Sequence, residues 1–157
     1  MKRNQNTNGL TLVELLVAIA IVALLAAGLY SVSRYVETQS KITLTESTIE
    51  TLVAALGEYY DFYGKFPDPC ETGYDGKCNL SVEKLYYKLG LAPGAKKIVG
   101  QINSSLIKDA NSDGFPEVVD AWDMNFNYSY TSGDNFPVID SNGPDKVAGN
   151  DDDITSR

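Results

Sequence analysis

The feature that most constrains this chain is an uninterrupted apolar run near its amino terminus. Residues 10–30 read LTLVELLVAIAIVALLAAGLY, and Glu14 is their only charged residue. About 20 apolar residues rising 1.5 Å each span a hydrocarbon core of about 30 Å, so the run predicts a membrane-spanning helix. The preceding residues, MKRNQNTNG, are polar and basic. We expect Lys2 and Arg3 to hold them in the cytoplasm and the rest of the chain to lie outside.

The order of these two segments argues against a secretory signal of the usual kind. Such signals are cut after their apolar core, behind small residues. Here the candidate scissile residue, Gly9, precedes the apolar run, so we expect the run to survive in the mature protein. By hydropathy alone, an ordinary uncut signal anchor explains the segment equally well.

The charge of Glu14 favours a processed chain over a simple anchor. A carboxylate deep in an apolar span costs roughly 2.5 to 3.5 kcal/mol, and less near an end. Cleavage after Gly9 would create a partner for it, the α-amino group of Leu10, in the same chain or in a neighbouring copy. A buried amine and carboxylate favour one stagger of bundled helices. We therefore expect Glu14 to set the register of assembly.

The run from Gly9 to Leu16, GLTLVELL, resembles the prepilin cleavage and methylation motif of type IV pilins and type II secretion pseudopilins. The resemblance implies that prepilin peptidase cuts after Gly9, that Leu10 becomes the N-methylated first residue, and that Glu14 is the family's acidic residue. It also implies a single-pass protein of the bacterial inner membrane. Its partners would be further copies in a helical filament, minor pilins or pseudopilins, and an inner-membrane assembly platform.

Beyond Tyr30 the chain becomes amphipathic, with no proline to end a helix. An apolar stripe recurs at three, four or seven residues and comprises Ile42, Ile49, Val53, Leu56, Tyr60 and Tyr63. One helix from Leu10 to about Tyr60 is expected, roughly 75 Å long at 1.5 Å per residue. Gly64 and Pro67 end the pattern. No heptad is sustained, which argues against a coiled coil.

The remaining residues predict a small head. Ser81 can cap a short helix that runs to Leu89, with Gly90 as its terminator. Segments 127–131 and 136–139 indicate a β-hairpin around the turn between them.

The segment LVAALGEYYDFYGKFP, residues 52–67, also resembles the end of the long helix in type II major pseudopilins. The predicted fold class is α+β and type IV pilin-like, with a long amino-terminal helix packed on a small antiparallel sheet. The expected parts are a cleaved leader at 1–9, the membrane half of the helix at 10–30, its amphipathic half at 31–64 and a periplasmic head at 65–157.

Cys70 and Cys78 enclose a short segment that contains Gly73, Asp75 and Gly76 and can turn sharply. In an extracytoplasmic head we expect these cysteines to form a disulfide. It would stabilise the head by about 2.5 kcal/mol in the chain-entropy model. Without histidine, two thiols fall short of four metal ligands, and a redox pair is more often spaced CxxC.

Composition excludes several classes of function. The chain has no histidine, so a histidine base, a histidine metal ligand and a Ser/His/Asp triad cannot be built. Its formal net charge of -8 favours cations over nucleic acid as partners. We expect no enzymatic activity, because no catalytic motif is recognisable and no two acids are placed in a pocket.

Two acidic segments could bind a hard cation such as calcium, which prefers oxygen ligands. The first carries Asp109, Asn111, Asp113 and Asp120, and its Asp-Asn-Asp-Gly order matches the first half of an EF-hand loop. Pro116 and the absence of flanking amphipathic helices argue against a true EF-hand. A calcium loop and a solvated turn both remain open.

The second acidic segment lies near the chain end, where three adjacent carboxylates repel one another unless the tail is frayed or a cation lies among them. Its Ser-x-Gly-x-Asp, Gly and Asp-Asp-Ile elements resemble the calcium loop of type II major pseudopilins. Asp120, Trp122 and Tyr128 match that family's preceding Asp-x-Trp segment and downstream Tyr. The resemblance implies calcium ligands drawn from Ser141, Asp145, Asp151, Asp152 and Asp153.

Three functions are compatible with these patterns. A structural subunit of a type II secretion pseudopilus agrees with both ends of the chain. A type IV or competence pilin shares every amino-terminal feature. A lone, membrane-tethered, calcium-dependent binding module would require no processing.

Intact mass spectrometry of the protein from its native membrane tests the predicted processing. We expect a mass that lacks residues 1–9 and carries one added methyl group. Reduction should then raise the mass by two hydrogens if Cys70 and Cys78 are joined. An uncut, unmethylated amino terminus would instead favour the tethered binding module.

Overall fold

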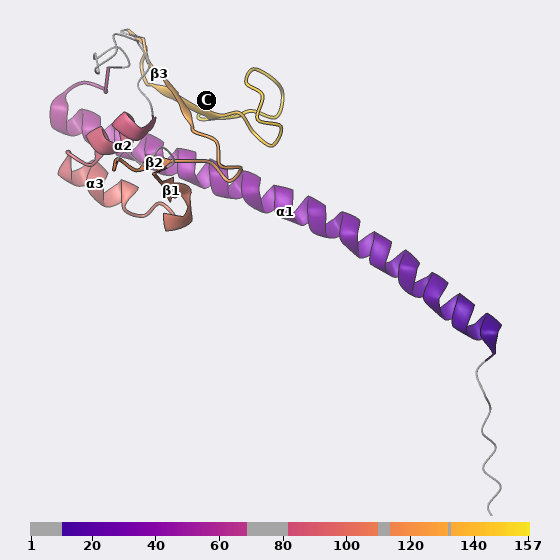
Figure 1. The fold of residues 1–157 in the computed structure, drawn as a ribbon. Helices are drawn as coiled ribbons and strands as arrows, with labels where there is room; N and C mark the ends of the chain where they lie inside the picture. Colours follow the sequence, from indigo (N-terminus) through magenta and orange to yellow (C-terminus); the bar gives the residue numbers. More distant parts are fainter. Residues whose placement is uncertain (1–10, 69–81, 110–113, 132) are drawn as a thin grey trace, which may run out of the picture. The chain divides into compact units, whose positions relative to one another are not determined.

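The computed structural model describes residues 11–68, 82–109, 114–131 and 133–157. These residues form an α+β fold. A long helix, α1 (Leu12–Tyr63), precedes α2 (Val82–Leu89), α3 (Pro93–Val99) and a 3-10 helix (Ser104–Leu106) (Figure 1). The strands are β1 (Ile107–Lys108), β2 (Glu117–Val118), β3 (Asn127–Ser129), β4 (Val138–Ser141) and β5 (Ile154–Thr155). A long helix followed by small antiparallel sheets confirms the predicted fold class.

The chain divides into two compact units, Met1–Thr38 and Gln39–Arg157. In the first, every described side chain from Thr11 to Glu37 is exposed. Up to Tyr30 these side chains are almost all apolar, on every side of the helix. A helix that is apolar all round requires lipid or other helices to cover it.

The second unit, which we call the head, is built around the later turns of α1. The α1 side chains buried there recur every three or four residues, and they are Thr45, Thr48, Ile49, Leu52, Ala55, Leu56 and Tyr59. The apolar ones among them form one cluster with residues of the other elements, among them Leu85, Leu89, Ala95, Val99, Val118 and Ile139. Figure 1 shows α2, α3 and the strands gathered around this part of α1.

The predicted apolar stripe has the right period but drifts from the buried face. Ile49 and Leu56 are buried as expected. The prediction is wrong for Tyr60 and Tyr63, which are 45% and 41% exposed. The buried face passes through Tyr59 instead, because a helix turns by about 100° per residue and a shift of one position changes the side that is covered.

The end of α1 follows the prediction. The Gly64 N–H donates to the Tyr60 carbonyl over 2.7 Å, and Gly64 has a φ of +70°. This left-handed conformation at the helix end favours glycine. Phe66 then stacks on Tyr60 with ring centroids 4.6 Å apart, and its ring also contacts Tyr130 and Phe136.

The short predicted helix corresponds to α2, which ends at Leu89. The Gly90 N–H donates to the Tyr86 carbonyl over 3.0 Å, in agreement with its predicted role as terminator. Ser81, the predicted cap, lies outside the described residues. The following helix, α3, was not predicted; it starts with Pro93, a residue that suits the first turn of a helix.

Two antiparallel sheets lie in the described part of the head. One pairs β1 with β2, and the other has the order β3-β4-β5. The predicted hairpin is confirmed, with Tyr128 opposite Ile139, although its strands are 127–129 and 138–141. Thr131 belongs to the connection and not to β3, because it is bonded to Asp134. The Asp134 N–H donates to the Thr131 carbonyl over 2.9 Å, and the Asp134 carboxylate accepts from the Thr131 N–H.

Tyr128 ties this hairpin to the segment that follows α1. Its hydroxyl donates to the Pro67 carbonyl over 2.8 Å in a buried position. Burial raises the pKa of Tyr128 above its usual value, because the ionised form would be poorly solvated.

Removing this hydroxyl should destabilise the head. We expect Tyr128→Phe to lower the free energy of unfolding by about 1 kcal/mol, because it leaves a buried carbonyl without its donor. The raised pKa makes the contribution fully present below the unfolded-state pKa of about 10 and lost as the pH rises further. Chemical denaturation of the detergent-solubilised chain at pH 7 and pH 11 measures both effects. Tyr60→Phe, at an exposed ring, is the control; equal stability of Tyr128→Phe and wild type at pH 7 would contradict the assignment.

Candidate functional site

Thr11 and Glu14 cap the amino-terminal end of α1. Thr11 directly precedes the first helical residue, Leu12. Its N–H donates to Glu14 Oε2 over 2.9 Å, and its hydroxyl donates to the same oxygen over 2.8 Å. In return, the Glu14 N–H donates to Thr11 Oγ1 over 3.3 Å. This is a capping box, a Thr-x-x-Glu pairing that satisfies main-chain donors at a helix start.

The capping box is compatible with a second role for Glu14. Both bonds to its carboxylate use Oε2, so Oε1 lies outside the box. Leu10 lies directly before Thr11 in the sequence, and both Leu10 and Gly9 are outside the described residues. Cutting after Gly9, or methylating the nitrogen of Leu10, removes neither the N–H nor the hydroxyl of Thr11. The box can therefore persist in a processed chain.

Within the described ranges, α1 is the helix that is long and apolar enough to cross a membrane. Near the end of its apolar stretch, Arg34 donates two hydrogen bonds to Tyr30 Oη, 3.1 Å from Nε and 2.7 Å from Nη2. Tyrosine and arginine are typical of the boundary between hydrocarbon and water. These features fit a membrane-anchored protein.

The loop between β4 and β5 carries four of the predicted calcium ligands, Asp145, Asp151, Asp152 and Asp153. Asp145 organises its first half: Oδ1 accepts from the Val147 N–H over 2.8 Å, and Oδ2 accepts from the Asn150 side-chain amide over 2.7 Å. Asp153 closes the far end, where its Oδ2 accepts from the Gly149 N–H over 2.7 Å. The carboxylates thus hold the loop by binding donors within it.

The two ends of this loop touch at Gly143. A side chain there would place its Cβ 2.1 Å from the Asp152 carbonyl oxygen, and Gly143 has a φ of +66°. Glycine alone permits this approach. Close by, the Asp145 N–H donates to Asp152 Oδ2 over 3.3 Å. The main-chain and side-chain oxygens of Asp152 therefore face the start of the loop.

A carboxylate oxygen in this loop lacks a donor. Asp153 Oδ1 is buried and accepts no hydrogen bond from the residues that the structure describes. A buried charged oxygen is costly unless an ion or a water meets it, so the chemistry of the loop fits a hard cation. Among the described residues, no three Asp, Glu or Cys side chains are grouped closely enough to hold a metal. A calcium ion here would need main-chain and amide oxygens beside the carboxylates.

Ser141, the fifth predicted ligand, makes a different contact. Its Oγ donates to Asp120 Oδ2 over 2.6 Å and accepts from the Gly143 N–H over 3.2 Å. Asp120 Oδ1 accepts from the N–H groups of Trp122 and Met124 over 2.8 and 2.9 Å. Both Ser141 and Asp120 are fully buried. The structure therefore joins the two predicted calcium segments through a hydrogen bond that was not predicted.

Thr45 of α1 binds the turn formed by residues 120–124. Its hydroxyl accepts from the Ala121 N–H over 3.3 Å, and its side chain is fully buried. Thr45, Asp120 and Ser141 together form what we call the polar anchor, which connects α1, the turn 120–124 and β4. Because each of these buried polar groups has a protein partner, the anchor fixes the position of the acidic loop relative to α1 within the head.

An exposed ion pair lies beside the turn. The Lys108 ammonium binds the Asp123 carboxylate and holds the pKa of Asp123 below its usual value. Because Asp123 is 71% exposed, solvent screens this pair and it contributes little to stability.

Other predicted sites lie partly or wholly outside the described residues. Cys70, Cys78, Asn111 and Asp113 are outside, so the disulfide and the first calcium segment stay predictions. Of that segment, Asp109 Oδ2 accepts from the Gly114 N–H over 3.0 Å.

Comparison with known proteins bears on the amino terminus. A family model described as the prokaryotic N-terminal methylation motif matches residues 4–30. The matched range contains Gly9, Leu10 and Glu14 together with the apolar run. No curated protein matches the chain, and no solved structure does. The chain thus carries a type IV prepilin-like signal, consistent with a pilin or a pseudopilin.

Proposed function

We propose that this protein is a subunit of a type IV pilin-like filament and, more specifically, of the pseudopilus of a type II secretion system. The observation that carries the proposal is the methylation motif at residues 4–30, joined to a helix whose described side chains are exposed from Thr11 to Glu37. The motif implies processing by prepilin peptidase and filament assembly. It belongs to structural subunits and not to an enzyme family.

In the proposed precursor, the apolar part of α1 spans the bacterial inner membrane. Lys2 and Arg3 stay in the cytoplasm, and the head lies in the periplasm. During assembly, the same helix of neighbouring copies replaces lipid around α1. Minor subunits and an inner-membrane assembly platform would take part in this exchange.

Cleavage after Gly9 changes the electrostatics at the start of α1. The new α-amino group of Leu10 is cationic and lies near the positive end of the helix dipole, which disfavours it. The Glu14 carboxylate offsets this charge from the same end of the helix, where Thr11 binds it. When helices pack, the amine of one copy attracts the Glu14 of another in a medium where unpaired charges are costly. Staggers that leave either charge unpaired are disfavoured, and one register is selected.

Two single substitutions separate the charge of Glu14 from its part in the capping box. Glu14→Gln keeps an oxygen that can accept from Thr11 but removes the charge. Filament yield should therefore fall about tenfold or more. Thr11→Ala keeps the charge and weakens the helix start by about 1 kcal/mol, so filaments should still form at near wild-type yield. Shearing cells and quantifying the released subunit measures the yield.

The two variants control each other. Equal yields from wild type and Glu14→Gln would contradict the register mechanism. Loss of filaments in Thr11→Ala but not in Glu14→Gln would assign Glu14 to helix capping alone. In each strain, the mass of the membrane-bound subunit verifies that cleavage after Gly9 has taken place.

The assignment to type II secretion depends on calcium binding by the loop 142–153. What supports it is the buried Oδ1 of Asp153, which has no donor among the described residues, together with the neighbouring oxygens of Asp152 and Asp145. Bound calcium would reduce the negative charge of the loop and cross-link its two ends. The chain's own hydrogen bonds already hold the loop closed, so the ion would stabilise a preformed shape.

Calcium should therefore raise the thermal stability of the head. At about a hundredfold excess over the dissociation constant, we expect a gain of about 2.7 kcal/mol, reversed by chelation. Asp153→Asn or Asp152→Ala should remove the gain. Asp123→Asn, which changes an exposed carboxylate bound to Lys108, should retain it. Identical melting curves with calcium and with chelator would rule out this site and favour a type IV or competence pilin.

A further inference from the structure

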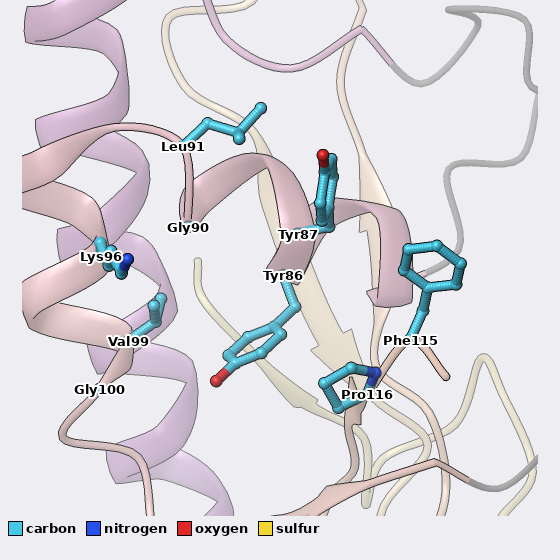
Figure 2. A pocket seen from close by; sticks show the side chains of 9 residues that line it. All are labelled: Tyr86, Tyr87, Gly90, Leu91, Lys96, Val99, Gly100, Phe115 and Pro116. Atoms are coloured by element: carbon cyan, nitrogen blue, oxygen red, sulfur yellow. The ribbon is translucent and has the colours of Figure 1, made fainter. Parts of the chain in front are cut away.

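The head carries an apolar pocket that neither α1 packing nor the acidic loop uses. It has a volume of about 330 Å³ and lies between α2, α3 and the segment 115–116 (Figure 2). Its walls include Tyr86, Tyr87, Leu91, Val99 and Phe115, with Lys96 at its edge. This volume is at the low end of the roughly 300–1,000 Å³ typical of ligand pockets, so it suits a side chain and its neighbours.

The rim of this pocket is exposed although it is apolar. Tyr87, Leu91 and Phe115 are 56%, 52% and 50% exposed, and the rings of Tyr87 and Phe115 meet edge to face with centroids 6.1 Å apart. Exposed apolar side chains gathered around a concave site mark a surface that another molecule covers.

The two helices beside the pocket are more basic than the rest of the head. Residues 82–100 contain four lysines and one acidic residue, whereas residues 118–157 contain eight acidic residues and two basic ones. Lys84, Lys96 and Lys97 are exposed. An apolar pocket flanked by exposed lysines on an acidic protein favours an acidic partner with an apolar contact residue.

The acidic loop of the head has this chemistry. Val147 is 57% exposed at the middle of the loop, between Asp145 and Asp151. The bonds of Asp145 to the Val147 N–H and to Asn150 hold this part of the loop in a defined shape. Figure 1 shows that the loop, drawn in yellow, lies away from α2 and α3 on the same head. The acidic loop therefore does not fill the pocket between α2 and α3 of its own chain.

We propose that the pocket between α2 and α3 receives Val147 and the acidic loop of a second copy of this chain, with Lys96 paired to Asp151. The proposal rests on the proposed filament and names a contact between neighbouring heads. The contact joins the pocket of one copy to the loop of the next copy. It is therefore heterologous and repeats from copy to copy, as a helical filament requires. Assembly through α1 holds the heads close together, so a contact too weak to pair free subunits can form.

A photo-crosslinking residue at position 147 tests this contact in the full-length chain. Filaments are assembled from equal amounts of isotopically heavy and light subunits, irradiated and digested. We expect cross-links to residues 86–100 or 115–116 of another copy, recognised by mixed heavy and light peptides. Cross-links confined to one label, or to a protein other than this chain, would overturn the proposal.

A charge exchange tests the same pairing without a cross-linker. Lys96→Glu alone and Asp151→Lys alone should each lower filament yield several-fold, and the double variant should restore it. Lys65→Glu, a matched change at an exposed lysine outside the pocket, should leave the yield unchanged. A double variant no better than the single variants would contradict the pairing.

These experiments distinguish failure of the proposed function from failure of the contact between heads alone. If the wild-type chain is not cut after Gly9 and forms no filaments, the proposed function fails. If it is cut and forms filaments, but position 147 does not reach the pocket of another copy, this inference alone fails.

Discussion

The carboxylate of Glu14 is the constraint on which the account depends. It is the one charge on about five turns of apolar helix, and a charge placed deep in such a span costs roughly 2.5 to 3.5 kcal/mol. Thr11 lowers this cost by donating its N–H and its hydroxyl to one carboxylate oxygen. The negative charge itself remains, and so does the uncovered apolar surface around it. In the proposed filament, both would be compensated when copies of the helix bundle with a cationic amino terminus beside each Glu14.

The later turns of the same helix organise the head. Ile49, Leu52 and Leu56 supply its apolar core, while the polar anchor of Thr45, Asp120 and Ser141 ties the sheet and the acidic loop to α1. A buried network of this kind is favourable because its donors and acceptors are paired with one another. It places the loop in a fixed position within the head, away from the pocket between α2 and α3. In the proposed filament, the acidic loop and the lysine-flanked pocket of one head would face different neighbours, so that α1 and the head contribute to the same one-dimensional assembly.

Much of this fold could be predicted from local patterns. The apolar run, the amphipathic period and Gly64 predicted α1, and Tyr128 and Ile139 lie in the predicted hairpin. The exact buried face was misplaced by one residue at Tyr60, because tyrosines on both sides of the boundary satisfy the period equally well. The Thr-x-x-Glu spacing alone indicates the capping box, a role of Glu14 that is separate from its charge in lipid. The bond between Asp120 and Ser141 could not be predicted, since it joins residues that only the packing of the turn against β4 brings together.

The most direct test of the Glu14 mechanism is a measurement between copies in the assembled filament. Filaments would be formed from a mixture of subunits labelled with ¹³C in glutamate and subunits labelled with ¹⁵N in leucine, so that a signal between the two labels arises between different chains alone. Solid-state NMR should then detect a short distance between the Glu14 carboxylate carbon and the α-amino nitrogen of Leu10 in a neighbouring copy. As a control, doubly labelled subunits are diluted among unlabelled ones, so that a signal arises within one chain. If well-ordered filaments give the signal in this control but not between chains, Glu14 pairs with the amino group of its own chain and does not set the register.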